Sequence, residues 1–328
     1  MTPTDTHRAS VAKHALLLAF GAILISFSPI FVKFLANDGM GPTAIAFWRM
    51  SFGAALFFAF ALTLGGNLAL TRRKMLFAFL AGLFFACDLS LWHRSIIMVG
   101  AGMATILGNT QVFWTALMGH FLYREKLTVL FKAAAPLGLI GIAILGGVGS
   151  AIAFTSTYLT GIFLGLGTGV AYALYLIALK QSTHESRSRE DGGTASVTAN
   201  MSMLQRLGEA AAMLAWVSFF GASCLGIGGF FEGANLSLGS TRDLLLLAGL
   251  AFVVQLIGWL AIYFSLERLP ASRSALIILL QPTFAMIWGQ IFFGESLTLL
   301  QLGGAALTLA AIYIGAARDL SKGTPVVS

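Results

Sequence analysis

The chain has 328 residues, of which 58% are hydrophobic and only 10% are charged. Soluble domains carry about a quarter charged residues, so this composition excludes a water-soluble globular protein. The net charge of +7 comes largely from basic residues in short segments between apolar runs, which is typical of membrane-protein loops and does not indicate nucleic-acid binding.

The apolar runs predict membrane-spanning helices. A helix that crosses about 30 Å of hydrocarbon needs about 20 residues, and the sequence supports about ten such spans. The predicted spans are 14–35, 43–65, 75–98, 101–122, 129–149, 158–179, 202–230, 243–266, 271–293 and 298–317. Basic residues precede the first run, which resembles a signal peptide, but no convincing cleavage site ends it, so we interpret it as a retained span.

The sequence contains two related copies. When it is shifted by 170 residues, Gln111 falls on Gln281 and Glu125 on Glu295. Five spans per copy is an odd number, so the second copy must be inverted. The predicted fold is an all-α membrane protein with ten transmembrane helices in two inverted five-helix repeats, a build in which substrate is held between the copies. The predicted parts are a first repeat over 14–149, a region 150–200 that includes span 6 and a flexible cytoplasmic linker at 181–200, and a second repeat over 158–317.

Lys and Arg indicate the orientation. If the N-terminus is cytoplasmic, the inner segments hold almost all basic loop residues, and Arg242 is the one basic residue at an outer edge. The outer loops without Lys or Arg are 36–42, 99–100, 150–157, 231–241 and 294–297. We therefore predict that both termini are cytoplasmic in a multi-pass protein of a cell inner membrane.

Several motifs resemble a known transporter family. They are the segments 28–33 (SPIFVK), 47–49 (FWR), 104–111 (ATILGNTQ), 172–180 (YALYLIALK), 269–275 (LPASRSA) and 281–282 (QP). Together with the ten spans and the duplication, they resemble the EamA-type members of the drug/metabolite transporter superfamily over about residues 14–317. One departure is that span 4 has Val112 where span 9 has Pro282.

The resemblance implies ten helices around a central cavity, with spans 1–4 and 6–9 lining it and spans 5 and 10 outside. It also implies movement of small metabolites, often outward and often amino acids or their relatives.

Asp88 is the sharpest candidate for substrate binding. It lies near the middle of span 3, where a carboxylate costs about 2.5–3.5 kcal/mol on insertion scales and is expected to face a cavity or a partner. Trp92 follows four residues later on the same helix face, and its indole suits an amine or an aromatic ligand. The alternative is that Asp88 pairs with a basic residue for architecture.

Other ionisable and aromatic candidates lie nearby. Arg49, beside Trp48, could bind a substrate carboxylate or pair with Asp88. His93 could relay protons or be a structural histidine. Glu209 is a second candidate for proton coupling beside Asp88, although an intrahelical ion pair with Arg206 is the preferred interpretation.

Polar residues within other spans complete the predicted site. They are Asn109 and Gln111 in span 4, Gln255, Trp259 and Tyr263 in span 8, and Gln281 in span 9. Gln255 and Trp259 repeat the polar–aromatic spacing of four residues seen at Asp88 and Trp92. Each could line the transport path or hold helices together.

The sequence thus predicts a secondary transporter that exports amino acids or related amines by alternating access. A multidrug efflux pump of the same fold is the main alternative, and a channel ranks lower. No metal-ligand cluster and no nucleophile–base pair occur at recognisable spacing, so no cofactor, metal or enzyme activity is predicted. The expected partners are the lipid bilayer and a small-molecule substrate. Formation of a homodimer is a further option that the sequence does not decide.

Overall fold

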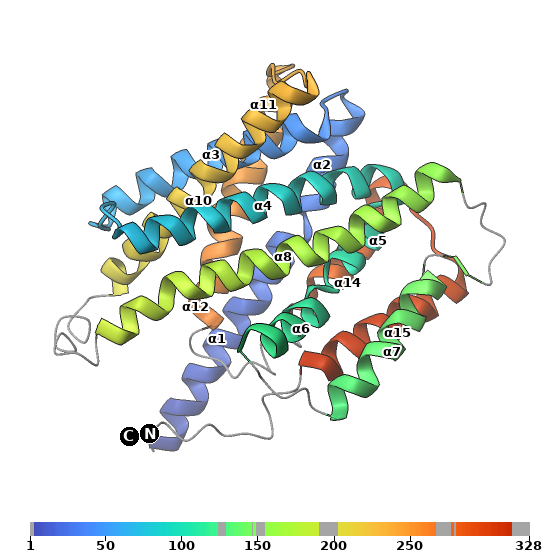
Figure 1. Ribbon diagram of the computed structural model, residues 1–328, viewed down its shortest axis with the longest axis horizontal. Helices are drawn as coiled ribbons and strands as arrows, with labels where there is room; N and C mark the ends of the chain where they lie inside the picture. The colour runs from blue at the N-terminus through green and yellow to red at the C-terminus, as the bar shows by residue number, and fades with distance from the viewer. Residues whose placement is uncertain are drawn as a thin grey trace.

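The computed structural model describes residues 3–123, 129–145, 147–148, 155–189, 203–266, 277–278 and 280–316. Every element in these ranges is a helix (Figure 1). Lipid offers the backbone no hydrogen-bond partner, so a helix, which pairs its polar groups internally, is the expected element for such apolar segments. The predicted all-α class is confirmed.

The first part of the chain forms seven helices within the described ranges. They are α1 (Pro3–Ser26), α2 (Ser28–Asn37), α3 (Pro42–Thr63), α4 (Arg72–Val99), α5 (Ala101–Gly108), α6 (Gln111–Tyr123) and α7 (Val129–Leu145). Predicted span 1 is interrupted at Phe27, because Pro29 at the start of α2 has no N–H with which to continue α1.

Predicted span 4 is also interrupted, although it contains no proline. The amide of Asn109 donates to the carbonyl of Thr105 at 2.8 Å, and the hydroxyl of Thr110 donates to that of Leu107 at 2.6 Å. Such side-chain bonds compete with the helical hydrogen bonds of the backbone. They explain why α5 ends and α6 begins around these two residues.

The second part contains the remaining described helices. They are α8 (Ser156–Arg189), α10 (Met203–Glu232), α11 (Thr241–Gly249), the π-helix η2 (Leu250–Gly258), α12 (Trp259–Leu266), α14 (Leu280–Phe293) and α15 (Leu299–Ala316). α8 continues to Arg189, so the first residues of the predicted flexible linker 181–200 are helical; 190–200 lie outside the described residues. α11, η2 and α12 follow one another directly and form predicted span 8.

Six helical segments are long and apolar enough to cross a membrane. They are Lys13–Asn37, Pro42–Thr63, Arg72–Val99, Ser156–Leu179, Leu204–Glu232 and Thr241–Ile262, and they coincide with predicted spans 1, 2, 3, 6, 7 and 8. Lys132–Leu145 and Leu299–Ile314 are shorter apolar helices at spans 5 and 10. The total of ten transmembrane helices stays a prediction.

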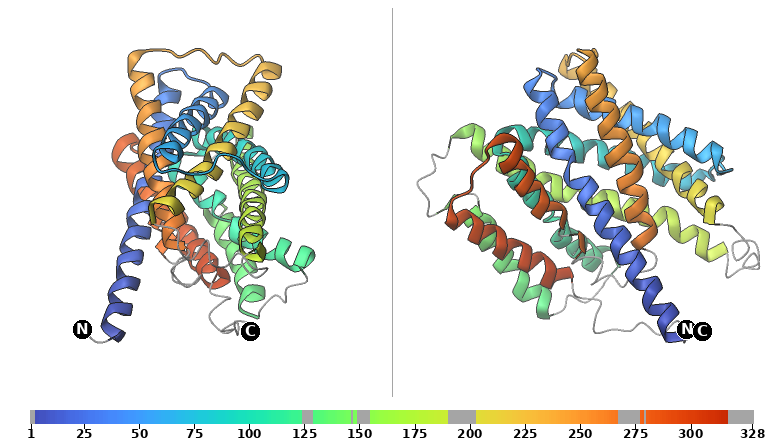
Figure 2. Two further views of the ribbon diagram at one scale, coloured as in Figure 1. Left: turned by 90° about the vertical axis from the view of Figure 1, so that its left-hand side faces the viewer. Right: turned by 180° about the vertical axis from the view of Figure 1, so that it is seen from behind.

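Helices from the two parts of the chain pack against each other. α4 lies along α8, α3 along α10, and α7 along α15 (Figures 1 and 2). Glycines allow close approach: a Cβ added at Gly82 of α4 would lie 2.7 Å from the carbonyl oxygen of Val217 in α10. One added at Gly141 of α7 would lie 2.9 Å from the carbonyl oxygen of Gly304 in α15.

The turn 38–41 between α2 and α3 and the loop 233–240 between α10 and α11 lie at one end of the molecule, far from the start of α1 (Figure 2). We call this the loop end. The last turn of α4 and the start of α5 belong to the same end, because His93 near the end of α4 contacts Pro42, which begins α3 directly after the turn 38–41.

Candidate functional site

A cavity lies between helices from both parts of the chain. Its lining residues are Ile25, Arg49, Phe85, Asp88, Leu89, Trp92, Thr105, Gly108, Asn109, Thr168, Tyr172, Trp259 and Gln281. Its volume is about 50 Å³, counted as space for the centres of water molecules. That space holds roughly three or four waters. A larger solute would therefore require side chains or helices to move.

Asp88 projects from the middle of α4 into this cavity. Its side chain is 6% exposed, and no hydrogen bond or ion pair of its carboxylate occurs within the described part of the chain. Only its backbone carbonyl is engaged, accepting from the Thr168 hydroxyl at 3.5 Å. A buried carboxylate without donors is costly to keep, so the cavity must supply water or a ligand to it.

Arg49 lies on α3 and reaches the same cavity. Nη1 donates to the hydroxyl of Ser28 at 2.9 Å, and Nε donates to Oε1 of Gln255 at 3.3 Å. The ion pairs found among the described residues do not include one between Arg49 and Asp88. Neutral groups therefore hold the guanidinium in place, and its charge is left to act on the cavity.

Aromatic rings form much of the cavity wall. The guanidinium carbon of Arg49 lies 5.9 Å from the ring centres of both Phe85 and Trp92, within the range of a cation–π contact. Tyr172 and Trp259 meet edge to face at 6.4 Å. The indole N–H of Trp259 is buried and has no acceptor among the described residues. The wall thus offers π-faces for a cation.

The predicted polar residues divide into two groups. Asn109 and Gln281 line the cavity. Gln111 instead accepts from the hydroxyl of Thr115 within α6, and Gln255 accepts from Nε of Arg49. Gln255 lies in the π-helix, whose extra residue per turn changes which side chains face α3. Gln255 therefore contacts Arg49 and is not among the residues that line the cavity.

The other predicted residues lie elsewhere. The Trp48 indole donates to the carbonyl of Leu236 in the α10–α11 loop at 2.8 Å. Glu209 accepts from the backbone N–H of Asn67 at 3.1 Å, in the connection between α3 and α4. Neither is among the residues that line the cavity. The side chain of Tyr263 lies outside the described residues.

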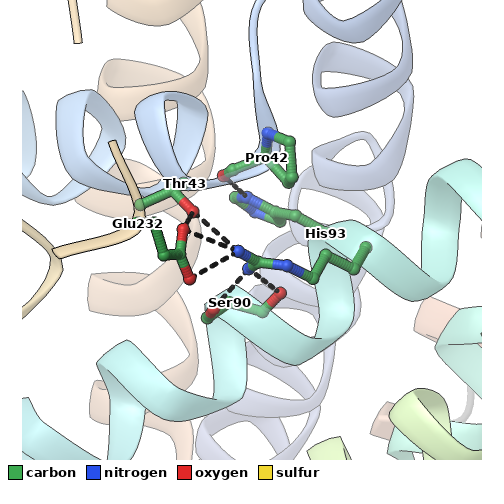
Figure 3. A network of polar contacts seen from close by, with 6 residues as sticks. Pro42, Thr43, Ser90, His93 and Glu232 are labelled. Carbon is green, nitrogen blue, oxygen red and sulfur yellow. Dashed lines mark hydrogen bonds and ion pairs between the residues drawn. The ribbon is translucent and has the colours of Figure 1, made fainter. Parts of the chain in front are cut away.

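His93 is not among the residues that line the cavity, and its ring contacts Pro42 at the start of α3 (Figure 3). Its Nδ1 lies 3.3 Å from the carbonyl oxygen of Pro42, and its buried Nε2 has no partner in the described ranges. The next residue, Arg94, donates from Nη2 to both carboxylate oxygens of Glu232 at 2.8 and 2.9 Å and to the hydroxyl of Thr43 at 2.9 Å. Nη1 of Arg94 donates to Ser90. Protein groups at the loop end therefore hold the Arg94 guanidinium.

Sequence reasoning missed several cavity residues. Phe85 lies one turn before Asp88 on the same face of α4, and helical spacing alone could have found it. Thr168 and Tyr172 are four residues apart on α8, and this spacing was visible, but nothing in the sequence indicated that α8 packs against α4. Thr105 lies among apolar residues, and nothing in the sequence around it indicated that it would line a cavity.

Within the described ranges, no three His, Cys, Asp or Glu side chains gather closely enough to hold a metal ion. The cavity instead presents one carboxylate, one guanidinium and several aromatic faces. This set can bind an ammonium group and a carboxylate at the same time.

Comparisons with known proteins identify the family of this chain. The model of the EamA-like transporter family matches residues 12–147 and 193–315. An "Uncharacterized transporter" of Archaeoglobus fulgidus is 25% identical over 268 residues, which cover 76% of this chain and 87% of that protein. A "Probable amino-acid metabolite efflux pump" of Salmonella typhimurium is 27% identical over 214 residues, covering 65% and 67% of the two chains.

A solved crystal structure has the same fold. It has a TM-score of 0.60 and covers 94% of this chain and 99% of its own, at 17% sequence identity. The two matched regions of the family model together span most of the sequence, once in each part of the chain. The chain is therefore a multi-pass membrane protein that belongs to the EamA-like transporter family, as the resemblance to the drug/metabolite transporter superfamily implied.

Proposed function

We propose that this protein is a secondary transporter that exports small amino acids or related amines across the inner membrane by alternating access. The observation that carries the proposal is the Asp88 carboxylate, which is buried in a cavity without a donor from the described residues. An ammonium group is the ligand that such a carboxylate would favour most. The relative from Salmonella typhimurium, named as an amino-acid metabolite efflux pump, supports the substrate class.

In the proposed complex, Asp88 accepts from the substrate ammonium group while Trp92 covers it with a π-face. Arg49 binds the substrate carboxylate. Asn109 and Gln281 line the remaining space. We propose Asp88, in preference to Glu209, as the group that exchanges a proton for substrate, because it is the carboxylate in the cavity.

Two inverted repeats, 14–149 and 158–317, would provide the alternating access. If spans 1–5 and 6–10 are equivalent, every helix contact should recur when each span is exchanged for its partner five places along. Span 3 packs on span 6, because α4 contacts α8. The exchange turns span 3 into span 8 and span 6 into span 1, so span 8 should pack on span 1. This contact is present, because α12 packs on α1. The packing of span 9 on span 1 (α14 on α1) likewise has its partner in span 4 on span 6 (α6 on α8). These matched contacts support the two-copy arrangement.

We further propose that both termini are cytoplasmic, so that the loop end faces outward. The cavity of about 50 Å³ then corresponds to a closed state, because the space is too small for most amino acids. Rocking of one repeat against the other would widen it from one side at a time.

A multidrug efflux pump is the second candidate, and one observation favours it. Phe85, Trp92, Tyr172 and Trp259 surround a single carboxylate, which also suits a flat aromatic cation. Such a ligand would not need Arg49. A substitution of Arg49 therefore separates the two functions: it should impair transport of amino acids but not transport of aromatic dyes.

The test is counterflow in proteoliposomes that contain the full chain. A panel of radiolabelled amino acids and amines is offered to the wild-type protein and to Asp88→Asn. We expect saturable exchange by the wild type and loss of exchange in the variant. Glu209→Gln is the matched control, because Glu209 is the other candidate carboxylate and does not line the cavity.

Thermal unfolding in detergent shows whether the variant is folded. Asp88→Asn should unfold at or above the wild-type temperature, because it removes an unpaired buried charge. A folded Asp88→Asn variant with normal exchange would refute the proposed role of Asp88. A wild-type protein that exchanges none of the panel, but confers resistance to cationic dyes in cells, would favour the multidrug function.

A further inference from the structure

Two polar residues at the end of α5, Thr105 and Asn109, line the cavity around Asp88, which we call the inner cavity. They lie four residues apart, so they occupy the same face of the helix. Thr105 is 2% exposed and Asn109 is 8% exposed. In the proposed complex, Asp88 and Arg49 hold the charged groups of the substrate, so this polar face is left to interact with the rest of the molecule.

The donors of both side chains are already used within the helix. The Thr105 hydroxyl donates to the carbonyl of Ala101 at 2.7 Å, and Nδ2 of Asn109 donates to the carbonyl of Thr105 at 2.8 Å. A carbonyl oxygen can only accept, so the second bond also fixes which end of the Asn109 amide is the nitrogen. Each residue therefore offers the cavity an acceptor, which is Oγ1 of Thr105 and Oδ1 of Asn109.

Oδ1 of Asn109 is open to the cavity. No side chain or backbone N–H in the described part of the chain donates to it. It also differs from Nε2 of His93, Oδ1 of Asp243 and Nε1 of Trp259, which lack a partner and are sealed from water. Water or solute in the cavity therefore supplies its hydrogen bond. A ligand that displaces this water must bring a donor of its own, because a buried acceptor without a donor is costly.

This acceptor face lies close to the proposed position of the ammonium group. A Cβ added at Gly108 would lie 3.0 Å from Cγ2 of Thr168 and 3.9 Å from Cδ1 of Trp92. Trp92 lies one turn after Asp88 on α4, and the Thr168 hydroxyl donates to the backbone carbonyl of Asp88. The end of α5 thus meets α4 and α8 at the level of Asp88. A small substrate held by Asp88 lies beside this face, within reach of a short side chain.

A neutral donor suits this face better than a second charge. Asp88 and Arg49 are the charged side chains in the lining, and the proposed complex pairs both of them with the substrate. A second ammonium group would find no further carboxylate among these lining residues. A hydroxyl group brings a donor in very little volume, which suits a cavity of about 50 Å³. Its lone pairs can also accept from the side-chain amide of Gln281 in the lining.

We infer that Thr105 and Asn109 form a side-chain subsite, which selects amino acids or related amines whose short, neutral side chain carries a hydrogen-bond donor, a hydroxyl group above all. The inference rests on the proposed function, because it takes the ammonium group at Asp88 as the anchor. An analogue without the hydroxyl would leave the two acceptors without a partner, and a site built to bond a hydroxyl rejects such an analogue for this reason.

Equilibrium binding to the purified full chain tests this subsite without transport. Serine and alanine form the first pair of probes, because they differ by one hydroxyl group. Ethanolamine and ethylamine form a second pair that lacks the carboxylate. The rise of the unfolding temperature with ligand concentration gives each apparent Kd. We expect serine to bind about tenfold more tightly than alanine, and ethanolamine to exceed ethylamine by a similar factor.

Two variants remove the acceptors at nearly constant side-chain volume. Thr105→Val and Asn109→Leu should each reduce the ratio of alanine Kd to serine Kd about threefold, and the double variant should bring it to about one. The Kd of alanine should stay unchanged. Thr308→Val is the matched control, because the buried Thr308 hydroxyl also donates to the carbonyl four residues earlier, at 2.8 Å, but does not line the cavity. It should keep the wild-type ratio.

The outcomes separate this inference from the proposed function. The inference is overturned if the wild type binds serine and alanine equally well, if neither pair of probes binds, or if the ratio persists in the folded double variant. Binding that shows the expected ratio but no exchange in proteoliposomes would overturn the transport function and leave the subsite in place. Exchange of amino acids with equal affinity for serine and alanine would do the opposite.

Discussion

The inner cavity and the loop end hold their charged side chains in opposite ways. In the cavity, Asp88 has no donor among the described residues and Arg49 is held by neutral groups. At the loop end, charges are matched in three ion pairs, which are Lys33–Glu295, Arg94–Glu232 and Asp38–Arg242. Each of these pairs joins a residue of the first predicted repeat to one of the second.

This difference separates two tasks for charge in a membrane protein. A matched pair between the repeats contributes to how the two halves fit together, and its loss should appear first in stability. A charge in the cavity that has no ionic partner is available to a ligand, so its loss should appear first in transport. The following substitutions test this separation.

The largest effect is expected for Arg49→Ala. It removes the donors to Ser28 and Gln255 as well as the charge that faces the cavity. We expect exchange in proteoliposomes to fall at least about tenfold, and the free energy of unfolding to fall by about 1–3 kcal/mol, because buried acceptors lose their partners.

Arg49→Lys is the matched variant for this test. Lysine keeps the charge but cannot present the planar fork that reaches Ser28 and Gln255 together, so partial stability and little transport are expected. Normal exchange by the alanine variant would mean that the cavity charges do not handle substrate, and the comparison with the loop end would collapse.

A smaller effect is expected for Gly53→Ala, which acts on the same site through its support. A Cβ at Gly53 in α3 would lie 2.8 Å from Cγ of Gln255, which must then move away from Arg49. We expect exchange to fall about threefold to tenfold, since a hydrogen bond to a charged group is worth about 1.5–3 kcal/mol and only part of it should be lost.

Gly228→Ala in α10 is the control for this change. Its added Cβ would meet open space, so stability should rise by up to about 1 kcal/mol with unchanged exchange. If Gly53→Ala and Gly228→Ala behave alike, the contact between α3 and the π-helix has no part in positioning Arg49.

At the loop end, Glu295→Gln should lower the free energy of unfolding, while the folded variant should keep its exchange activity. The Glu295 carboxylate pairs with Lys33 and accepts from the backbone N–H of Ala101 at 3.0 and 2.9 Å, at the start of α5. We expect a loss of about 1–2 kcal/mol in unfolding free energy, because both a charged helix cap and an ion pair are weakened. Lys33→Met removes only the ion pair and should cost less. Equal losses would assign the effect to the ion pair alone.

Much of the fold could be predicted from the sequence because lipid imposes a simple rule on apolar runs. Six predicted spans coincide with the membrane-length helices, with boundaries that differ by a few residues. Pro29 accounts for the interruption at Phe27 within a span that was predicted to be continuous, whereas the interruption at Asn109 and Thr110 depends on side-chain bonds that residue types alone do not specify. The π-helix around Gln255 had no sequence signal either.

The site was predictable where one helix determines it. Asp88 and Trp92 were found through their spacing on α4, and both line the cavity. The fate of His93 was not predictable, because the neighbour that it meets, Pro42, belongs to another helix and only the packing of α3 on α4 brings them together. The acidic side chains of the loop end have the same cause, since Asp38, Glu232 and Asp243 come from three separate segments.

The smallest effect is expected for Arg242→Ala. Arg242 donates to Asp38 at 2.7 Å and joins the two halves like the other pairs, yet its side chain is 61% exposed. Exposed ion pairs contribute about 0–1 kcal/mol, because water screens them and two flexible side chains must be ordered. We expect unfolding free energy to change by less than about 0.5 kcal/mol and exchange to stay normal, with the residual effect vanishing at high salt. A large, salt-independent loss of unfolding free energy would show that even this exposed ion pair holds the two halves together. The difference in burial between Arg242–Asp38 and Lys33–Glu295 would then not determine how much each pair contributes.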